Sequence, residues 1–417
     1  CGMRTITDLH IHSRFSRACS PELTVPNLAR WARRKGIDLL GTGDFTHPGW
    51  LADLERDLIE IAPGTYEHSA EPGARFVLSS EVACIYKRGG KVRRMHHVLL
   101  APDFAAVHEI RAALEKLGKN LKADGRPILG MDSVDLLHLL QEADPRSLLI
   151  PAHAWTRWFG LFGSESGFDA ITVCFGDDTK YIHAIETGLS SDPAMNWRLS
   201  QLDDLLILSN SDAHSLRNLG REASVFALSE WTYGALHDAI VARDTTKLVE
   251  TIEFFPEEGK YHLDGHRVCG IRWTPEETTK HKGICSVCGK QVTVGVLARV
   301  AALADRPDGG KPAYAVPFKS IVPLEQIIGE VLSVGPTSKK VRQMYERLTD
   351  RVGNEFAILL DMPIARISVE GGDRIAEAIR RVRAAKLTVL GGFDGQFGTV
   401  RIFPDDEQKK AKQKTLL

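Results

Sequence analysis

The chain has 417 residues, and its 53 lysines and arginines nearly balance its 54 aspartates and glutamates. This length predicts about two or three domains, and the balanced charge by itself indicates no polyanionic partner. No apolar run approaches the roughly 20 residues that a membrane span needs, so no membrane partner is expected. Of the seven cysteines, only Cys269, Cys285 and Cys288 are clustered. That pattern favours a reducing cytoplasm and one metal site over a disulfide framework.

Short apolar strands alternate with amphipathic helices from the N-terminus to about residue 255. Strands are expected at 5–7, 37–42, 75–85, 91–101, 148–150, 182–187 and 205–208. Helices are expected at 26–35, 104–118, 132–142, 192–202 and 231–242, and the first of them should end at Gly36. Gly89-Gly90 predicts a hairpin between two of the strands. Repeated strand–helix units imply a parallel sheet or barrel whose function lies at the carboxyl ends of the strands.

Histidines and acidic residues recur at the expected ends of these strands. In the first stretch, Asp8-Leu-His-Ile-His12, the two imidazoles point to the same side because side chains alternate along a strand. Taken alone, this stretch fits a histidine-rich strand end without function equally well. The residues that continue the series are Asp44, His47, Glu81, His97, His153, Glu186, Asp212 and His214. Imidazoles and carboxylates gathered at one edge of a sheet can bind divalent metals.

The order of these residues over about 5–215 resembles the PHP (polymerase and histidinol phosphatase) superfamily. The resemblance implies a distorted (β/α)7 barrel that holds a cluster of two or three metal ions. One metal would be bound by His10, His12, Glu81 and Asp212. A second would share Glu81 and add His97 and His153, whereas His96 should face away from the cluster.

A third metal would use His214 with residues near Asp44 and His47. Here the chain departs from the family pattern, because Phe45 stands where the family usually has histidine, and His47 is the candidate substitute. Metals that share a carboxylate lie about 3.5–4 Å apart, lower the pKa of a bridging water and clamp both oxygens of an in-line displacement. A net positive cluster of Zn²⁺, Mn²⁺ or Mg²⁺ would attract a phosphodiester.

Residues 256–295 have the ligand spacing of a zinc ribbon. His266-x-x-Cys269 is followed, after fifteen residues, by Cys285-x-x-Cys288-Gly. The glycine permits the tight turn around a metal. His266 is the favoured fourth ligand, with His281 and His262 as alternatives. A site with four protein ligands is closed, so we expect a structural zinc.

Residues 296–404 are expected to be mostly helical and to bind DNA, with helices at 294–304, 323–334, 337–350 and 372–384. The start of one helix carries Lys339, Lys340 and Arg342, where the helix dipole disfavours cations unless an anion is bound. With Arg198, they are the candidate contacts to a nucleic-acid backbone; a solvated helix face is the alternative. A glycine-rich turn at 391–398 fits either a base-stacking platform or a plain hairpin.

The polar tail, residues 405–417, is expected to be disordered. Its last residues, Gln413–Leu417, resemble the Gln-x-x-Leu core by which short terminal peptides dock on sliding clamps. Such short patterns also arise by chance.

Together, the barrel motifs, the 186–198 stretch and Cys285-x-x-Cys-Gly-Lys are similar to endonuclease Q, a family of DNA repair enzymes. The resemblance implies strand nicking 5′ to deaminated bases (uracil, hypoxanthine, xanthine) or abasic sites, with the damaged base everted into a pocket. It also implies a cytoplasmic, nucleoid-associated enzyme. A phosphatase for small esters would explain the barrel but not the ribbon. A degenerate, non-catalytic DNA-binding barrel should have lost acidic ligands, and this chain keeps them.

Overall fold

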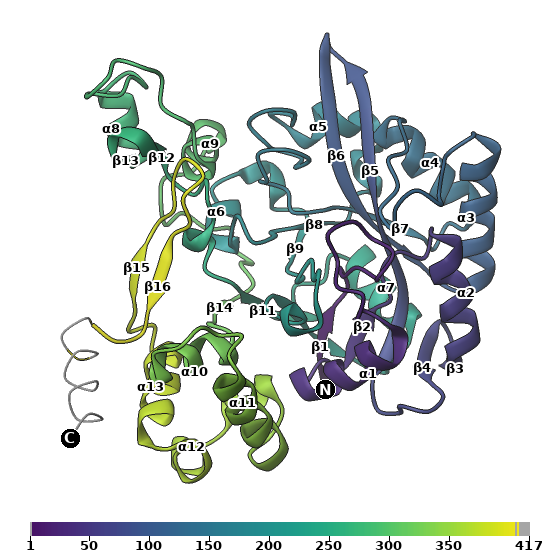
Figure 1. Ribbon diagram of the computed structural model, residues 1–417. Helices are drawn as coiled ribbons and strands as arrows, with labels where there is room; N and C mark the ends of the chain where they lie inside the picture. Colours follow the sequence, from purple (N-terminus) through teal and green to yellow (C-terminus); the bar gives the residue numbers. More distant parts are fainter. Residues whose placement is uncertain (1, 405–406, 408–417) are drawn as a thin grey trace.

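The computed structural model describes residues 2–404 and Glu407. A ten-stranded mixed sheet forms its frame (Figure 1). The strands follow the order β14-β11-β10-β1-β2-β5-β4-β3, and β6 pairs with β5 and with β7. Their bounds are β1 (Met3–Asp8), β2 (Leu39–Gly41), β3 (Leu58–Ala62), β4 (Thr65–His68), β5 (Arg75–Arg88), β6 (Lys91–Ala101), β7 (Leu148–Pro151), β10 (Ala223–Leu228), β11 (Leu248–Glu253) and β14 (Phe318–Ser320).

A separate parallel pair, β8 (Ala184–Glu186) and β9 (Leu206–Leu208), completes a ring of strands. The Ala154 N–H donates to the Glu186 carbonyl at the end of β8. Beyond β9, the Leu9 N–H after β1 donates to Asn210 at 2.7 Å. The ring therefore runs β1-β2-β5-β6-β7-β8-β9, which confirms the predicted distorted barrel. The sheet is mixed, however, because β5 and β6 are antiparallel.

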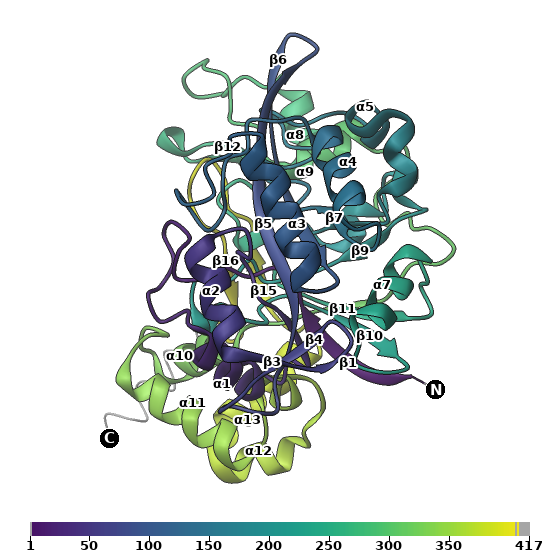
Figure 2. The ribbon, with the colours of Figure 1, turned by 90° about the vertical axis from the view of Figure 1, so that its right-hand side faces the viewer.

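Helices cover the outside of this barrel, as Figure 2 shows for α3 in front of β5. Their bounds are α1 (Val25–Lys35), α2 (Pro48–Asp57), α3 (Phe104–Lys116), α4 (Ser133–Ala143), α5 (Ile171–Phe175), α6 (Pro193–Asn196) and α7 (Tyr233–Val241). Gly36 ends α1 at a φ of 88°, a left-handed conformation that favours glycine, as predicted. The helix predicted at 192–202 is instead split into α6 and a 3-10 turn at Ser200–Leu202.

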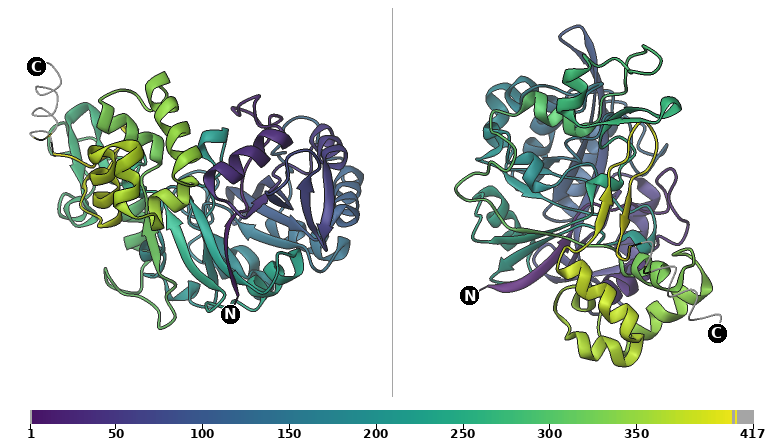
Figure 3. Two further views of the ribbon diagram at one scale, coloured as in Figure 1. Left: turned by 90° about the horizontal axis from the view of Figure 1, so that it is seen from below. Right: turned by 90° about the vertical axis from the view of Figure 1, so that its left-hand side faces the viewer.

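The zinc-ribbon region consists of the β12 (Asp264–His266) and β13 (Ile271–Trp273) hairpin, with α8 (Pro275–Lys280) and α9 (Val296–Leu303). The C-terminal part is helical, with α10 (Leu324–Leu332), α11 (Lys339–Arg351), a π-helical turn (Ala357–Asp361), α12 (Ile364–Gly371) and α13 (Asp373–Arg383). A final hairpin, β15 (Thr388–Leu390) and β16 (Thr399–Arg401), runs from these helices back toward the ribbon (Figure 3). At its tip, Asp394 accepts hydrogen bonds from the Arg267 N–H and the Thr293 hydroxyl, both at 2.7 Å.

A buried ion pair joins the helical part to the barrel. Lys35 Nζ of α1 lies 2.7 Å from Glu355 Oε2, and both side chains are almost fully buried. Glu355 also accepts from the Tyr345 hydroxyl and the Leu324 N–H. Because one carboxylate ties α10, α11 and α1 together, the helical part sits in a fixed position on the barrel.

None of the helices within the described range is long and apolar enough to cross a bilayer. The predicted tail, residues 405–417, lies outside the described residues except for Glu407, and so does its Gln413–Leu417 motif.

Candidate metal centres

Four side chains meet at the mouth of the barrel: His10, His12, Glu81 and Asp212. Their ligand atoms all lie within 4.8 Å of one another. His12 Nε2 is 3.1 Å from both Glu81 Oε2 and Asp212 Oδ1, and His10 Nε2 is 3.5 Å from Glu81 Oε2. These are the four side chains that the sequence predicts as the ligands of one metal, and the structure brings them together.

A second group shares Glu81 and consists of Glu81, His96 and His153. Glu81 Oε1 lies 2.7 Å from His96 Nδ1 and 3.0 Å from His153 Nε2. Each oxygen of Glu81 therefore faces a different set of imidazoles. A carboxylate placed in this way can bridge two metal ions.

His97, which the sequence predicts as a ligand, lies outside this group, and His96, which is expected to face away, lies in it. In the β5–β6 ladder, Glu81 lies opposite Val98 and Ala83 lies opposite His96. Directly opposite residues share a face, and faces alternate along each strand, so His96 points to the side of Glu81 and His97 to the other. His97 Nε2 instead lies 2.8 Å from the Ser133 hydroxyl. These ligands also sit inside long strands and not at strand ends, because β5 and β6 extend past the barrel rim.

Carboxylates behind the centre hold the imidazoles in place. His10 Nδ1 lies 2.9 Å from Glu186, which also accepts from the His153 N–H and from Asn210. His12 Nδ1 lies 3.0 Å from Asp44 Oδ1. With Nδ1 donating its proton, each ring turns the lone pair of Nε2 toward the centre. Buried His10 Nε2 has no hydrogen-bond partner, which fits a nitrogen that ligates a metal.

The structure does not assemble the predicted third metal site. No ligand group within the described residues includes Asp44, His47 or His214. Asp44 Oδ2 accepts from the Ser13 N–H and hydroxyl and from the Ser16 hydroxyl, so both oxygens are occupied. His47 caps α2 by accepting from the Gly49 and Trp50 N–H groups. His214 lies at the rim, with its ring 4.5 Å from the ring of His12.

Sequence reasoning missed Arg126, whose Nη1 lies 3.0 Å from Glu81 Oε2. Burial favours the neutral form of Glu81, but His96, His10 and Arg126 outweigh it and hold the pKa of Glu81 well below its ordinary value. Arg126 lies in a long loop between α3 and α4, and no motif or spacing marks it. Three non-glycine residues of the site, Asp44, His153 and Asp212, have positive φ, a strain often found at functional sites.

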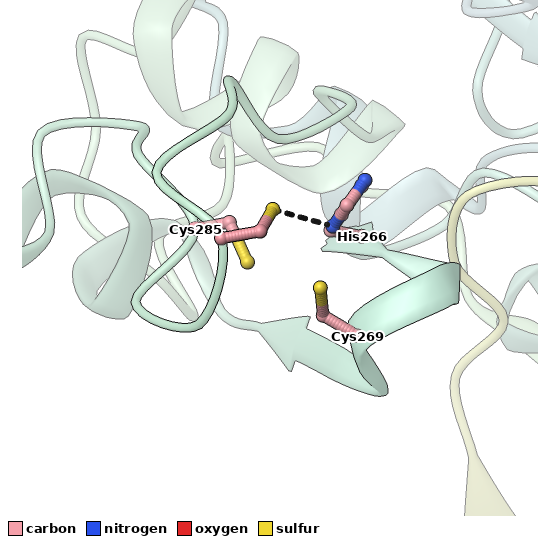
Figure 4. Close-up of side chains that lie close together, drawn as sticks. His266, Cys269 and Cys285 are labelled. Carbon is pink, nitrogen blue, oxygen red and sulfur yellow. Dashed lines mark hydrogen bonds between the residues drawn. The ribbon is translucent and has the colours of Figure 1, made fainter.

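The four predicted ligands of the structural zinc also come together, with His266, Cys269, Cys285 and Cys288 within 4.8 Å. Figure 4 shows His266, Cys269 and Cys285 facing a common central space. Burial raises the pKa of the Cys285 thiol, but the N–H groups of Cys288 and Val287 outweigh it and lower the pKa to about 6. A thiolate is the form that binds zinc.

The alternative fourth ligands of this site lie elsewhere. The ring of His281 stacks on Trp273 with a centroid distance of 4.4 Å. His262 is buried and lines a cavity beside Tyr261 and Trp158. His266 Nδ1, by contrast, is 3.4 Å from the Cys288 sulfur.

Three of the four predicted DNA contacts are close together in the chain, and the fourth, Arg198, lies far from them in sequence and is less exposed. Lys339, Lys340 and Arg342 are exposed at the start of α11, where Ser338 caps the helix. Arg342 lines a cavity together with Ser215, the residue after His214. Arg198 is half-buried, and its carbonyl accepts from the N–H groups of residues 305 and 306.

Comparisons with known proteins agree with this architecture. The family model described as the MJ0043 C-terminal domain matches residues 323–386. The crystal structure of the lesion-specific endonuclease PfuEndoQ from Pyrococcus furiosus is similar at 33% identity and a TM-score of 0.85, covering 99% of this chain and 98% of that one. A structure of endonuclease Q with a 27-mer duplex carrying an abasic lesion at the active site is similar at 33% identity and a TM-score of 0.84, covering 98% of each chain.

A curated relative, the uncharacterized protein MJ0043 of Methanocaldococcus jannaschii, is 31% identical over 274 residues. The match covers 63% of this chain and 33% of that protein, so this chain spans about a third of that relative's length.

Proposed function

Because this chain belongs to the endonuclease Q family, we propose that it nicks DNA 5′ to deaminated bases and abasic sites. The chain is a metal-dependent endonuclease; uracil, hypoxanthine and xanthine as targets belong to the proposal. One observation carries the proposal. Oε2 of Glu81 faces the imidazoles of His10 and His12, and Oε1 faces those of His96 and His153. The related structure with an abasic duplex at its active site supports DNA as the substrate.

The donor set fits two metal ions. His10, His12 and Asp212 would hold one with Glu81, and His96 and His153 would hold the other. Four imidazoles favour Zn²⁺ or Mn²⁺ over Mg²⁺, which prefers oxygen ligands. Bound metals would supply a water of lowered pKa and neutralise charge that develops on the phosphate oxygens.

The chain's own side chains prepare this chemistry. Glu186 and Asp44 fix the tautomers of His10 and His12, so that both rings present a lone pair to the centre. Arg126, a quarter exposed beside Glu81, offers a cation to the non-bridging oxygens of the scissile phosphate. His214 at the rim can contact the same phosphate.

Outside the centre, the proposal includes two further elements. The site formed by His266 and the three clustered cysteines would hold a structural zinc. Lys339, Lys340, Arg342 and Arg198 would contact the DNA backbone, which should make binding depend on salt.

The test is incubation with end-labelled duplexes that carry one uracil, hypoxanthine or abasic site, with Zn²⁺, Mn²⁺ or Mg²⁺ added. A single product ending 5′ to the lesion is expected, with no cut in the unmodified duplex. Asp212→Asn removes a charged ligand at nearly constant shape and should abolish nicking while DNA binding persists. Intact lesion duplexes together with rapid hydrolysis of small phosphate esters would replace this proposal with a phosphatase.

A further inference from the structure

The β5–β6 hairpin carries the metal centre at its middle and projects beyond the other strands of the barrel at its tip (Figures 1 and 2). The ladder pairs Ala83 with His96, Ile85 with Arg94, and Lys87 with Val92. Glu81 has the same parity as Ala83, Ile85 and Lys87 on β5. One face of the hairpin therefore runs from Glu81 and His96, past Arg94, to Lys87 near the tip.

The opposite face is used to attach the hairpin to the barrel. Arg88 pairs with Asp132 and donates to the Cys174 carbonyl. Arg93 donates to the Gly167 carbonyl, and its guanidinium lies 4.1 Å from the ring centroid of Phe168. The arginines on this face are thus committed to structural contacts.

The metal-bearing face also carries two cations, Arg94 and Lys87. Within the described part of the chain, neither Lys87 nor Arg94 forms a salt bridge with a carboxylate. The Arg94 guanidinium lies instead over the ring of Trp158, 5.3 Å from its centroid. Trp158 is 49% exposed, although a large indole is usually mostly buried.

Trp158 is tied to the metal centre through its neighbour, Phe159. The Phe159 carbonyl accepts from the His96 N–H at 2.9 Å, and its ring lies 4.3 Å from the ring of His96. Trp158 also lines a cavity with Tyr261, and the Arg157 guanidinium lies 5.5 Å from the Tyr261 ring centroid. Two exposed aromatic rings, each with an arginine, therefore border one cavity, whose lining also includes Thr156, 2.8 Å from His153 Nδ1.

We propose that this face is a track for the DNA strand beside the lesion, with one nucleobase stacked on Trp158 and backbone phosphates on Arg94 and Lys87. The inference rests on the proposed function and adds the path of the strand. An unstacked base binds an aromatic ring regardless of its identity, and cations follow the backbone. Along β5, Ile85, the ladder partner of Arg94, lies about 13 Å from Glu81, and Lys87 lies about 20 Å from it. These distances correspond to a few nucleotides of an extended strand.

The stacking contact is tested with duplexes carrying an abasic site and 2-aminopurine at successive positions on either side. One position should change fluorescence on binding, and Trp158→Ala should abolish that change and weaken binding roughly tenfold. Trp158→Phe should retain most of the signal. The matched control is Tyr314→Ala, which removes another exposed aromatic ring and should have no effect.

The phosphate contacts are tested by the salt dependence of binding. Lys87→Ala and Arg94→Ala should each lower the slope of log K against log salt by about 0.7–0.9. Lys91→Ala is the matched control, because Lys91 lies at the same tip but on the opposite face, paired with Arg88. The proposed track would be contradicted if Lys87→Ala and Lys91→Ala changed the salt slope equally. It would also be contradicted if Trp158→Ala left the 2-aminopurine signal unchanged. Lesion-specific nicking by the wild type would still stand in that case, so the two proposals fail separately.

Discussion

At the scale of single residues, Glu81 links the two ligand groups because its oxygens face opposite sides. His96 lies on the Glu81 face of the hairpin, and His97, one residue later, is hydrogen-bonded to Ser133. The two neighbouring histidines therefore have separable roles.

We expect His96→Ala to lower the single-turnover nicking rate by at least about 100-fold, because the second group then keeps one imidazole. His97→Asn should nick at nearly the wild-type rate and lose only thermal stability. Nicking rates at saturating DNA and the metal content of both variants are the measurements. A similar loss of nicking in the two variants would contradict the assignment.

Glu253 on β11 gives a prediction about pH. Burial raises its pKa to about 8, even though the hydroxyls of Ser209, Thr251 and Thr187 hydrogen-bond to it. The folded protein therefore binds this proton more tightly than the unfolded chain, whose ordinary value is 4.5. The resulting stability is complete below the unfolded pKa and is lost as the pH rises through the folded one.

Glu253→Gln mimics the protonated carboxyl and removes this pH dependence. Its melting temperature relative to wild type should rise steadily between about pH 5 and pH 9. Thermal melts at several pH values measure the difference. A constant difference across this range would show that Glu253 titrates as an ordinary carboxyl.

The histidine positions show what sequence can and cannot specify at this scale. His10, His12, His153 and Asp212 follow strands whose direction is readable from apolar runs, so their meeting was predictable. Which of His96 and His97 faces Glu81 depends on the register of β6 against β5. The pattern of apolar residues does not fix this register to within one residue, and a shift of one residue exchanges the two faces. Arg126 comes from a loop whose path is set by packing, and no local signal reports it.

At the scale of elements, glycines correctly predicted where a hairpin turns and where a helix ends. Gly89-Gly90 makes the hairpin turn, and Gly36 ends α1. The parallel arrangement inferred from strand–helix alternation is wrong for β6 and β7, which pair antiparallel although α3 and α4 lie between them in the chain. The helix expected after Asp192 stops at Asn196, since tertiary contacts override helical periodicity in so short a segment.

We expect the folding of the proposed zinc ribbon, residues 256–295, to depend most directly on a ligand. Its small apolar cluster consists of Trp273, Cys285 and Val292, packed against Cys269 and Ile271. So few apolar contacts cannot hold the element without a metal cross-link.

Cys285→Ser should therefore lose the tightly held zinc, melt at a lower temperature and bind DNA more weakly. Zinc content per chain, measured after the weaker metals have been stripped, gives the direct check. Val287→Ser, an exposed position between two ligand cysteines, serves as the control and should keep its zinc. Full zinc retention by Cys285→Ser would exclude this residue as a ligand.

At the scale of the whole molecule, the contact between the barrel and the C-terminal helices includes the buried Lys35–Glu355 pair. Removing one partner of a buried ion pair leaves an uncompensated charge, which costs about 3–5 kcal/mol. We expect Glu355→Ala to destabilise the protein by about that amount in denaturant titrations.

The control for this prediction is Glu370→Ala. Glu370 contacts Arg347 and Arg351, both of which are exposed, so its loss should cost less than about 1 kcal/mol. Equal destabilisation by the two variants would mean that the buried pair has no special part in holding the helical region.

The metal centre is assembled from distant parts of the chain: His12 and Asp212 are 200 residues apart in sequence and 3.1 Å apart in space. A ribosome adding 5–20 residues per second needs roughly 10–40 s to synthesise that interval. During this time the emerging polypeptide has its first two imidazoles but lacks the aspartate that completes their group. A chain that ends before Asp212 lacks one of the four side chains of this group, so we expect such a truncated product to have no nicking activity.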